Sequence, residues 1–131
     1  MPSNFDPIKT AEGWQISNAP IMGMAPLVAS MNLYDSASME KVRKKGIRLT
    51  AYFEFLLNFF LPEIIIITPE KKGSQLSIKV KKGKSIFNAI VKKGVVCDWR
   101  EPNVIRLAPH PLFNSYKEVY RAVKRIESVY K

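Results

Sequence analysis

The strongest pattern in the sequence is a series of apolar positions that recurs every three or four residues between positions 39 and 60. Such spacing places the side chains on one face of a helix. The positions are Met39, Val42, Gly46, Leu49, Phe53, Leu56 and Phe60. Because Pro62 cannot continue a helix, the pattern predicts one long amphipathic helix over about 38–60. Gly46 lies on the buried face, so we expect another part of the backbone to pack closely there.

Three further helices are indicated by residues at their ends. Ser115 and Glu118 have the spacing of a capping box, which predicts a helix over about 115–130. Gly94 suits the C′ position of a helix over about 85–93. Pro26 can occupy a first helical turn, which predicts a helix over about 25–35. The prolines within residues 1–20 predict an extended N-terminal segment.

Four segments have the composition of strands. The four successive isoleucines within 63–68 predict a strand buried on both faces. Residues 75–81 alternate, with Leu76 and Ile78 inward and Ser77 outward, as in a half-exposed antiparallel strand. Residues 95–99 and 104–107 predict two short strands, separated by a turn at 102–103.

The order of these elements predicts the fold class. Helices and strands mix within one chain of 131 residues, which suits a single domain over 1–131. We expect an α/β (α+β) fold, with an antiparallel or mixed sheet of three or four strands and helices mainly on one face.

Composition excludes several classes of protein. One cysteine and one histidine cannot form a disulfide framework or a Cys/His zinc cluster, so no metal is expected, and the lone thiol favours a cytoplasmic setting. Residues 1–10 lack the apolar core of a signal peptide. The most apolar window, residues 53–67, is too short and too charged to span a membrane.

The formal net charge of +10 raises the alternative of a basic nucleic-acid-binding domain. The lysines and arginines are scattered in small groups, however, without the interleaved glycine and aromatic residues of RNA-recognition modules. A solvated surface explains this charge better than a nucleic-acid partner does.

Motifs of catalysis are absent, and single reactive residues have structural explanations. The sequence has no P-loop, dinucleotide fingerprint, zinc-protease motif or nucleophile elbow. Cys97 lies in an apolar strand, where a buried structural thiol is favoured over a nucleophile. His110 stands between Pro109 and Pro111, and no local signature supports a role for it in a catalytic triad.

Arg106 breaks the local pattern because it lies in the middle of an apolar strand that leads into a proline-rich loop. An arginine there can face solvent or pair with an acidic residue, for which Asp98 and Glu101 are candidates. If it faces a cleft, its planar guanidinium is suited to a carboxylate. A second unusual segment, residues 13–20, is polar and aromatic and ends at Pro20.

Several blocks of sequence together resemble the C-terminal part of kynureninase. They are Gly-Trp-Gln-Ile-Ser-Asn at 13–18, the stretch 27–34, the stretch 39–57 with its Leu-Thr-Ala-Tyr-Phe-Glu-Phe-Leu, Gly-Val-Val-Cys-Asp-Trp-Arg-Glu-Pro at 94–102, and Ile-Arg-Leu-Ala-Pro-His-Pro-Leu-Phe-Asn-Ser-Tyr at 105–116. The blocks occur in the family's order and span nearly the whole chain.

The resemblance implies the C-terminal domain of a fold-type I enzyme dependent on pyridoxal 5'-phosphate. Such enzymes hydrolyse L-kynurenine or 3-hydroxykynurenine to an anthranilate and L-alanine, in tryptophan catabolism and NAD biosynthesis. By resemblance, Arg106 binds the substrate carboxylate and Asn18 contacts both the cofactor and the substrate. The matched positions with supporting roles are Trp14, Ser17, Asp98 and Trp99.

Two essential residues of that family have no match in this chain. They are the lysine that binds the cofactor covalently and the aspartate that pairs with its pyridine nitrogen. Lys117 follows a tyrosine but is predicted on a surface helix, so it is not that lysine. The resemblance therefore implies a partner, the large cofactor-binding domain, in an enzyme expected to be a homodimer. We expect the chain alone to be inactive.

A different class remains open, namely a non-catalytic interaction or assembly module derived from this domain. Without a large domain, apolar side chains that normally pack on it would be exposed or covered by self-association. Met22, Met24, Leu27 and Trp14 are the candidates for that surface.

Overall fold

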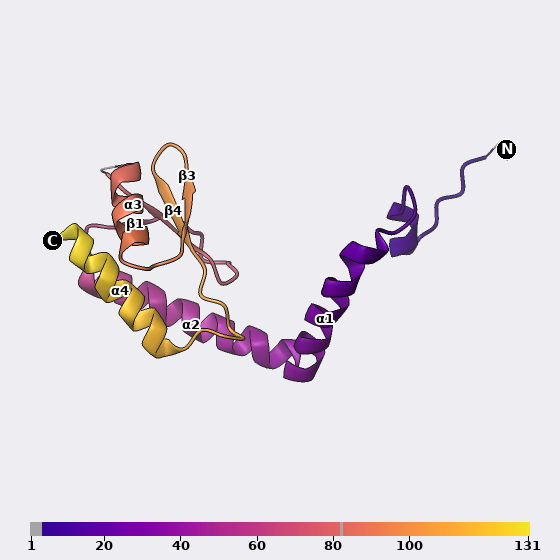
Figure 1. The fold of residues 1–131 in the computed structure, drawn as a ribbon, viewed down its shortest axis with the longest axis horizontal. Helices are drawn as coiled ribbons and strands as arrows, with labels where there is room; N and C mark the ends of the chain where they lie inside the picture. Colours follow the sequence, from indigo (N-terminus) through magenta and orange to yellow (C-terminus); the bar gives the residue numbers. More distant parts are fainter. Residues whose placement is uncertain (1–3, 82) are drawn as a thin grey trace. The chain divides into compact units, whose positions relative to one another are not determined.

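The computed structural model describes residues 4–81 and 83–131, and the chain divides into two compact units. The N-terminal unit, Met1–Ser38, contains the 3-10 helix η1 (Ala11–Trp14) and helix α1 (Ile21–Ala37). The sheet unit is Met39–Lys131. Its elements are α2 (Met39–Phe60), β1 (Ile65–Ile66), β2 (Leu76–Lys79), α3 (Lys84–Lys92), β3 (Asp98–Arg100), β4 (Val104–Leu107) and α4 (Tyr116–Tyr130), drawn in Figure 1.

The four strands form one antiparallel sheet in the order β1-β2-β4-β3. The predicted fold class is thus confirmed, with four strands and purely antiparallel pairing. In the register of the two central strands, Ile78 of β2 lies opposite Ile105 of β4, and Ser77 lies opposite Arg106. On the other side of β4, Trp99 lies opposite Ile105 and Asp98 opposite Arg106.

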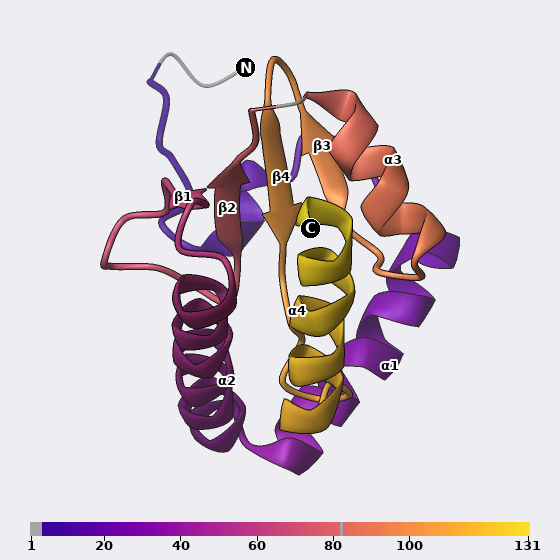
Figure 2. The same cartoon turned by 90° about the vertical axis from the view of Figure 1, so that its left-hand side faces the viewer.

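One face of this sheet carries the hydrophobic core. Its buried side chains on the central strands are Leu76, Ile78, Ile105 and Leu107. Helices α2, α3 and α4 add Leu49, Leu57, Ile90, Val123 and Ile126 to the same cluster. Figure 2 shows α2 and α4 side by side, with most of both helices below the strands. Because the helices cover this face, alternate residues of each strand lie on the opposite, open face.

The long amphipathic helix forms close to its predicted bounds. The predicted positions from Val42 to Leu56 are buried, whereas Met39 is exposed at the start of the helix and Phe60 is half-buried at its end. Gly46 is closely approached, as expected, but by side chains rather than backbone. A β-carbon at Gly46 would lie 3.1 Å from Ser74 Oγ and 3.6 Å from Pro111 Cγ, so the loops after β1 and β4 pack against α2 there.

The predicted helix ends of α3 and α4 are present. The Ser115 hydroxyl accepts a hydrogen bond from the Glu118 backbone N–H, and the Glu118 carboxylate accepts one from the Ser115 backbone N–H at 2.7 Å. This reciprocal pair is the capping box, and it satisfies donors that the first turn of α4 would leave unpaired. Gly94 follows α3 with φ of +78°, a conformation that favours glycine.

The isoleucine run at 64–67 differs from the prediction. We expected a strand buried on both faces, but β1 is a short strand at the edge of the sheet, with Ile64 buried and Ile65 and Ile67 exposed. Its burial alternates because helices cover only one face of the sheet, so that every second residue of the strand faces the core. β3 also starts later than predicted, at Asp98, and Val96 before it is exposed.

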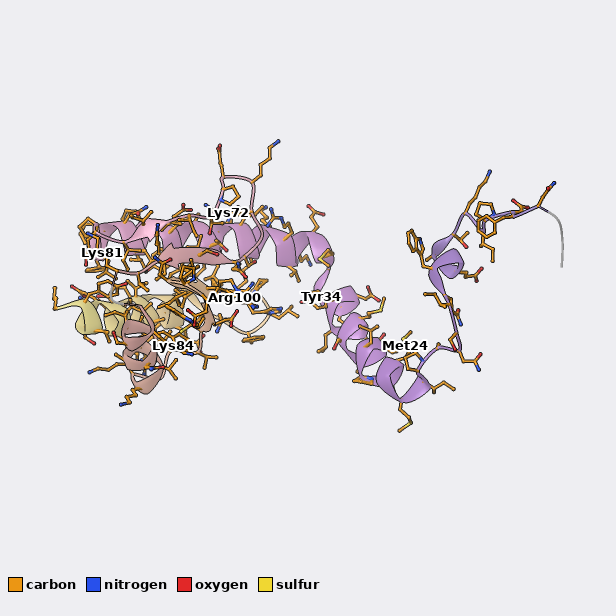
Figure 3. The ribbon with its side chains drawn as sticks, turned by 90° about the horizontal axis from the view of Figure 1, so that it is seen from above. Met24, Tyr34, Lys72, Lys81, Lys84 and Arg100 are labelled. Carbon is orange, nitrogen blue, oxygen red and sulfur yellow. The ribbon has the colours of Figure 1, made fainter. Side chains whose placement is uncertain are left out.

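Helix α1 starts earlier than predicted. Pro20 is its N-cap, and the N–H groups of Gly23 and Met24 bond to the Pro20 carbonyl, which places Pro26 inside the helix rather than in its first turn. Side chains project from α1 in all directions (Figure 3), and no residue of this helix is buried. Within residues 4–81 and 83–131, no helix is both long and apolar enough to cross a membrane.

Replacing Ile78 with alanine should lower the free energy of unfolding by about 2–5 kcal/mol, because Ile78 is 0% exposed and its loss leaves a cavity. Ile65 has the same side chain on the neighbouring strand but is 54% exposed, so Ile65→Ala should cost less than about 1 kcal/mol. Urea unfolding curves measure both values. Equal losses would contradict the assignment of β1 to a half-exposed sheet edge.

Candidate functional site

Arg106 lies near the middle of the open face of the sheet. Its neighbours in β4, Ile105 and Leu107, are buried on the helical side, so the pleat directs Arg106 the other way. Ser77 of β2 and Asp98 of β3 are its partners across the two strand pairs. The Arg106 side chain is 32% exposed, so part of it remains accessible to solvent.

Asp98 holds the Arg106 guanidinium. Its Oδ2 accepts a hydrogen bond from Arg106 Nε at 2.8 Å and a second one from Nη2. The same oxygen lies 3.2 Å from Arg100 Nε. The hydrogen bond from Arg106 lowers the pKa of Asp98, and the positive charges of Arg100 and Arg106 act in the same direction. Asp98 is therefore a carboxylate shared between two arginines.

Trp99 supports the site from the other side of the sheet. It is half-buried against the core, and its ring packs against Phe87 with centroids 5.9 Å apart. Its indole N–H donates to Glu101 at 2.7 Å. Of the two acidic partners considered for Arg106, the structure selects Asp98, since Glu101 is engaged by Trp99. The anchored tryptophan fixes the strand that carries Asp98.

The loop after β4 is closed by hydrogen bonds. The His110 backbone N–H donates to the Asn114 side chain at 2.7 Å, and the Asn114 backbone N–H donates to the His110 carbonyl at 2.8 Å. The His110 ring stacks on Phe113, with centroids 4.6 Å apart. These contacts give His110 a structural role in the turn that leads from β4 to α4.

The other sequence-predicted site residues lie in the N-terminal unit. Trp14 ends η1 and is 88% exposed, and Ser17 and Asn18 follow it in an exposed segment. Asn18 and Arg106 thus belong to different units of the chain. The structure brings Arg106 and Asp98 together, whereas a shared site for Asn18 and Arg106 stays a prediction.

Two residues of this site were not singled out from the sequence. Ser77 is opposite Arg106 on β2, and Arg100 is the second cation on Asp98. The outward position of Ser77 followed from the alternation along its strand, but its pairing with Arg106 depends on strand register. Arg100 could have been found because it lies two residues after Asp98, on the same face of β3.

Metal sites and reactive thiols have little support in the part of the chain that the structure describes. Among those residues, no cluster of histidine, cysteine and acidic side chains could hold a metal ion. Burial raises the pKa of the Cys97 thiol, which disfavours the reactive thiolate. A hollow of about 680 Å³ lies between α4 and the loops at 94–96 and 108–114, but Arg106 does not line it.

The family model and the curated relatives agree on one family. Residues 42–126 match the model of the kynureninase C-terminal domain. The chain is 47% identical to the kynureninase of Koribacter versatilis over 95% of its length, and 44% identical to that of Flavobacterium psychrophilum over 92%. It is 43% identical to that of Stenotrophomonas maltophilia over 98%. These alignments cover 31%, 30% and 32% of the relatives, so the chain spans about a third of their length.

A solved structure shares the fold. The structure is 8-amino-7-oxononanoate synthase from Francisella tularensis, with a TM-score of 0.60 over 89% of this chain and 35% of that chain. The sequence identity is 13%, so this likeness concerns the fold alone.

The pairing of Asp98 with Arg106 should make stability depend on pH. Because the folded-state pKa of Asp98 is lowered, its contribution is present above the ordinary carboxyl value of about 3.9 and is lost as pH falls through the folded-state value. We expect Asp98→Asn to lower the urea midpoint at about pH 6 and to have a smaller effect at about pH 3, below the ordinary carboxyl value.

A double-mutant cycle provides the control for this prediction. In an Arg106→Gln background, the effect of Asp98→Asn at neutral pH should shrink, because the main partner of the carboxylate has gone. An effect of the same size at both pH values, or in both backgrounds, would show that Asp98 acts on stability without Arg106.

Proposed function

The chain belongs to the kynureninase C-terminal domain family, and from this premise we propose that it forms the carboxylate-binding side of a kynureninase-like active site. The reaction is hydrolysis of L-kynurenine or 3-hydroxykynurenine to anthranilate or 3-hydroxyanthranilate and L-alanine. The observation that carries the proposal is a fixed, accessible guanidinium on the open face of the sheet, held by Asp98 at its Nε and Nη2 atoms.

Arg106 is proposed to bind the α-carboxylate of the substrate. A guanidinium has five N–H donors, and Asp98 occupies one on Nε and one on Nη2. The remaining donors on Nη1 and Nη2 form a fork that matches the two oxygens of a carboxylate. The bond that breaks in the reaction is not a bond of this carboxylate. Binding of the carboxylate therefore serves to orient the substrate.

Asn18 is proposed to orient the substrate carbonyl and to contact the edge of pyridoxal 5'-phosphate. The residue is exposed, so its carboxamide is accessible to ligands. The cofactor, when bound, supplies an electron sink. Lys117 is exposed in the first turn of α4, and we assign it no role at the cofactor. The covalent lysine and the partner of the pyridine nitrogen are proposed to belong to the large domain.

The large domain is also the proposed partner of α1. A helix that is apolar on every side is normally buried, yet Met22, Met24 and Leu27 of α1 are all exposed. The relatives are about three times as long as this chain, so they contain the polypeptide that could cover such a helix. We further expect the complete enzyme to be a cytoplasmic homodimer.

In a complete enzyme that carries this chain as its C-terminal third, Arg106→Ala should raise the KM for kynurenine with a smaller effect on kcat. The loss of one charge-assisted hydrogen bond costs about 1.5–3 kcal/mol, which corresponds to a rise of roughly 10- to 150-fold. Steady-state kinetics measure the change. Arg48→Ala, which removes an exposed arginine from α2, serves as the control and should leave KM unchanged. An unchanged KM in Arg106→Ala would refute the carboxylate role.

The chain alone should not form a specific covalent adduct with pyridoxal 5'-phosphate. Its surface lysines should react weakly and without saturation, because the groups that anchor the cofactor are proposed to belong to the large domain. Absorbance titration followed by borohydride reduction and peptide mapping measures the adducts. A saturable adduct at one lysine would mean that this chain holds the cofactor itself.

A further inference from the structure

The two sides of the Arg106 guanidinium differ in what they contact. The lateral edge, formed by Nε and Nη2, faces Asp98, and both of its N–H groups donate to Oδ2. The other edge, formed by Nη1 and Nη2, is the end of the side chain. A guanidinium is planar, so fixing one edge also fixes the direction of the other.

The pairing of β3 with β4 fixes the contact between Asp98 and Arg106. Asp98 and Arg106 are directly opposite each other on β3 and β4. On the adjacent residue pair, Trp99 and Ile105 lie on the buried face, and Ile105 is fully buried. The Asp98 carboxylate thus contacts the lateral edge of Arg106 from the neighbouring strand and has no hydrogen bond to Nη1 in the described residues.

The local charge also leaves room for an anion. Asp98 carries one negative charge, while Arg106 and Arg100 carry two positive charges, and both arginines contact the same Oδ2. The cluster keeps a net positive charge after Asp98 is counted. A second carboxylate is thus attracted to the cluster rather than repelled by Asp98.

We propose that Asp98 is a positioning residue, which holds Arg106 by its lateral edge so that the end edge binds the substrate carboxylate. The inference rests on the proposed function of Arg106. The opposite possibility is that Asp98 competes with the substrate for the guanidinium. Positioning predicts weaker substrate binding when Asp98 loses its charge, whereas competition predicts tighter binding.

The geometry can be tested on this chain alone. In NMR spectra, the Arg106 Nε–H signal should be resolved from those of the other arginines and exchange slowly with water, because it donates to a carboxylate. Asp98→Asn should shift this signal and speed its exchange. Glu70→Gln removes an equal charge from an exposed position in the loop between β1 and β2, and should leave the signal in place. A signal indifferent to Asp98→Asn would overturn the proposal.

The functional part is tested in the complete enzyme. Asp98→Asn should raise the KM for kynurenine by about tenfold with a smaller change in kcat, since a loosened guanidinium must be ordered on binding. Glu70→Gln should leave KM unchanged. In an Arg106→Ala background, Asp98→Asn should add no further increase, because Asp98 acts through Arg106.

The outcomes separate the inference from the function on which it rests. If Arg106→Ala leaves KM unchanged, the proposed carboxylate role fails, whatever Asp98→Asn does. If Arg106→Ala raises KM while Asp98→Asn lowers it or leaves it unchanged, the carboxylate role stands and the positioning role is refuted. Additive effects of the two substitutions would indicate that Asp98 acts independently of Arg106.

Discussion

The alternation of side chains along β4 is the constraint on which the candidate site depends. Ile105 and Leu107 are drawn to the helical side by the hydrophobic effect, and the residue between them must then lie on the open face. A shift of one residue in register would bury a guanidinium and expose two aliphatic side chains, which is costly on both counts. The core therefore determines where Arg106 points.

The same register determines its partner. Pairing with β3 places Asp98 across from Arg106, and Trp99 ties that strand to the core through its contact with Phe87. A carboxylate held beside an arginine would normally neutralise it. Here Arg100 contacts the same carboxylate oxygen, so the cluster remains cationic while the guanidinium is held in one orientation. The Arg106 guanidinium can therefore be held in one orientation and still attract an anion.

Local signals in the sequence were sufficient for much of the sheet unit. The spacing of apolar residues in α2 and the Ser115–Glu118 pair predicted elements whose cause lies within a few residues. The isoleucines of β1 were misjudged, because whether a strand lies at an edge depends on its neighbours in the sheet. For the site, residue spacing offered Asp98 and Glu101 as partners of Arg106. Only strand register could select between them.

The apolar composition of helix α1 has no local explanation within its own unit. The apolar side chains of α1 lie on all sides of the helix, and none of them is buried. While they face water, they contribute no hydrophobic stabilisation. The open face of the sheet likewise presents the edge of the Arg106 guanidinium that Asp98 does not contact. Two surfaces in two units each require a complement, one apolar and one anionic. Under the proposed function, a large domain that covers α1 and presents a carboxylate substrate would satisfy both, so one partner would account for two features that lie in different units.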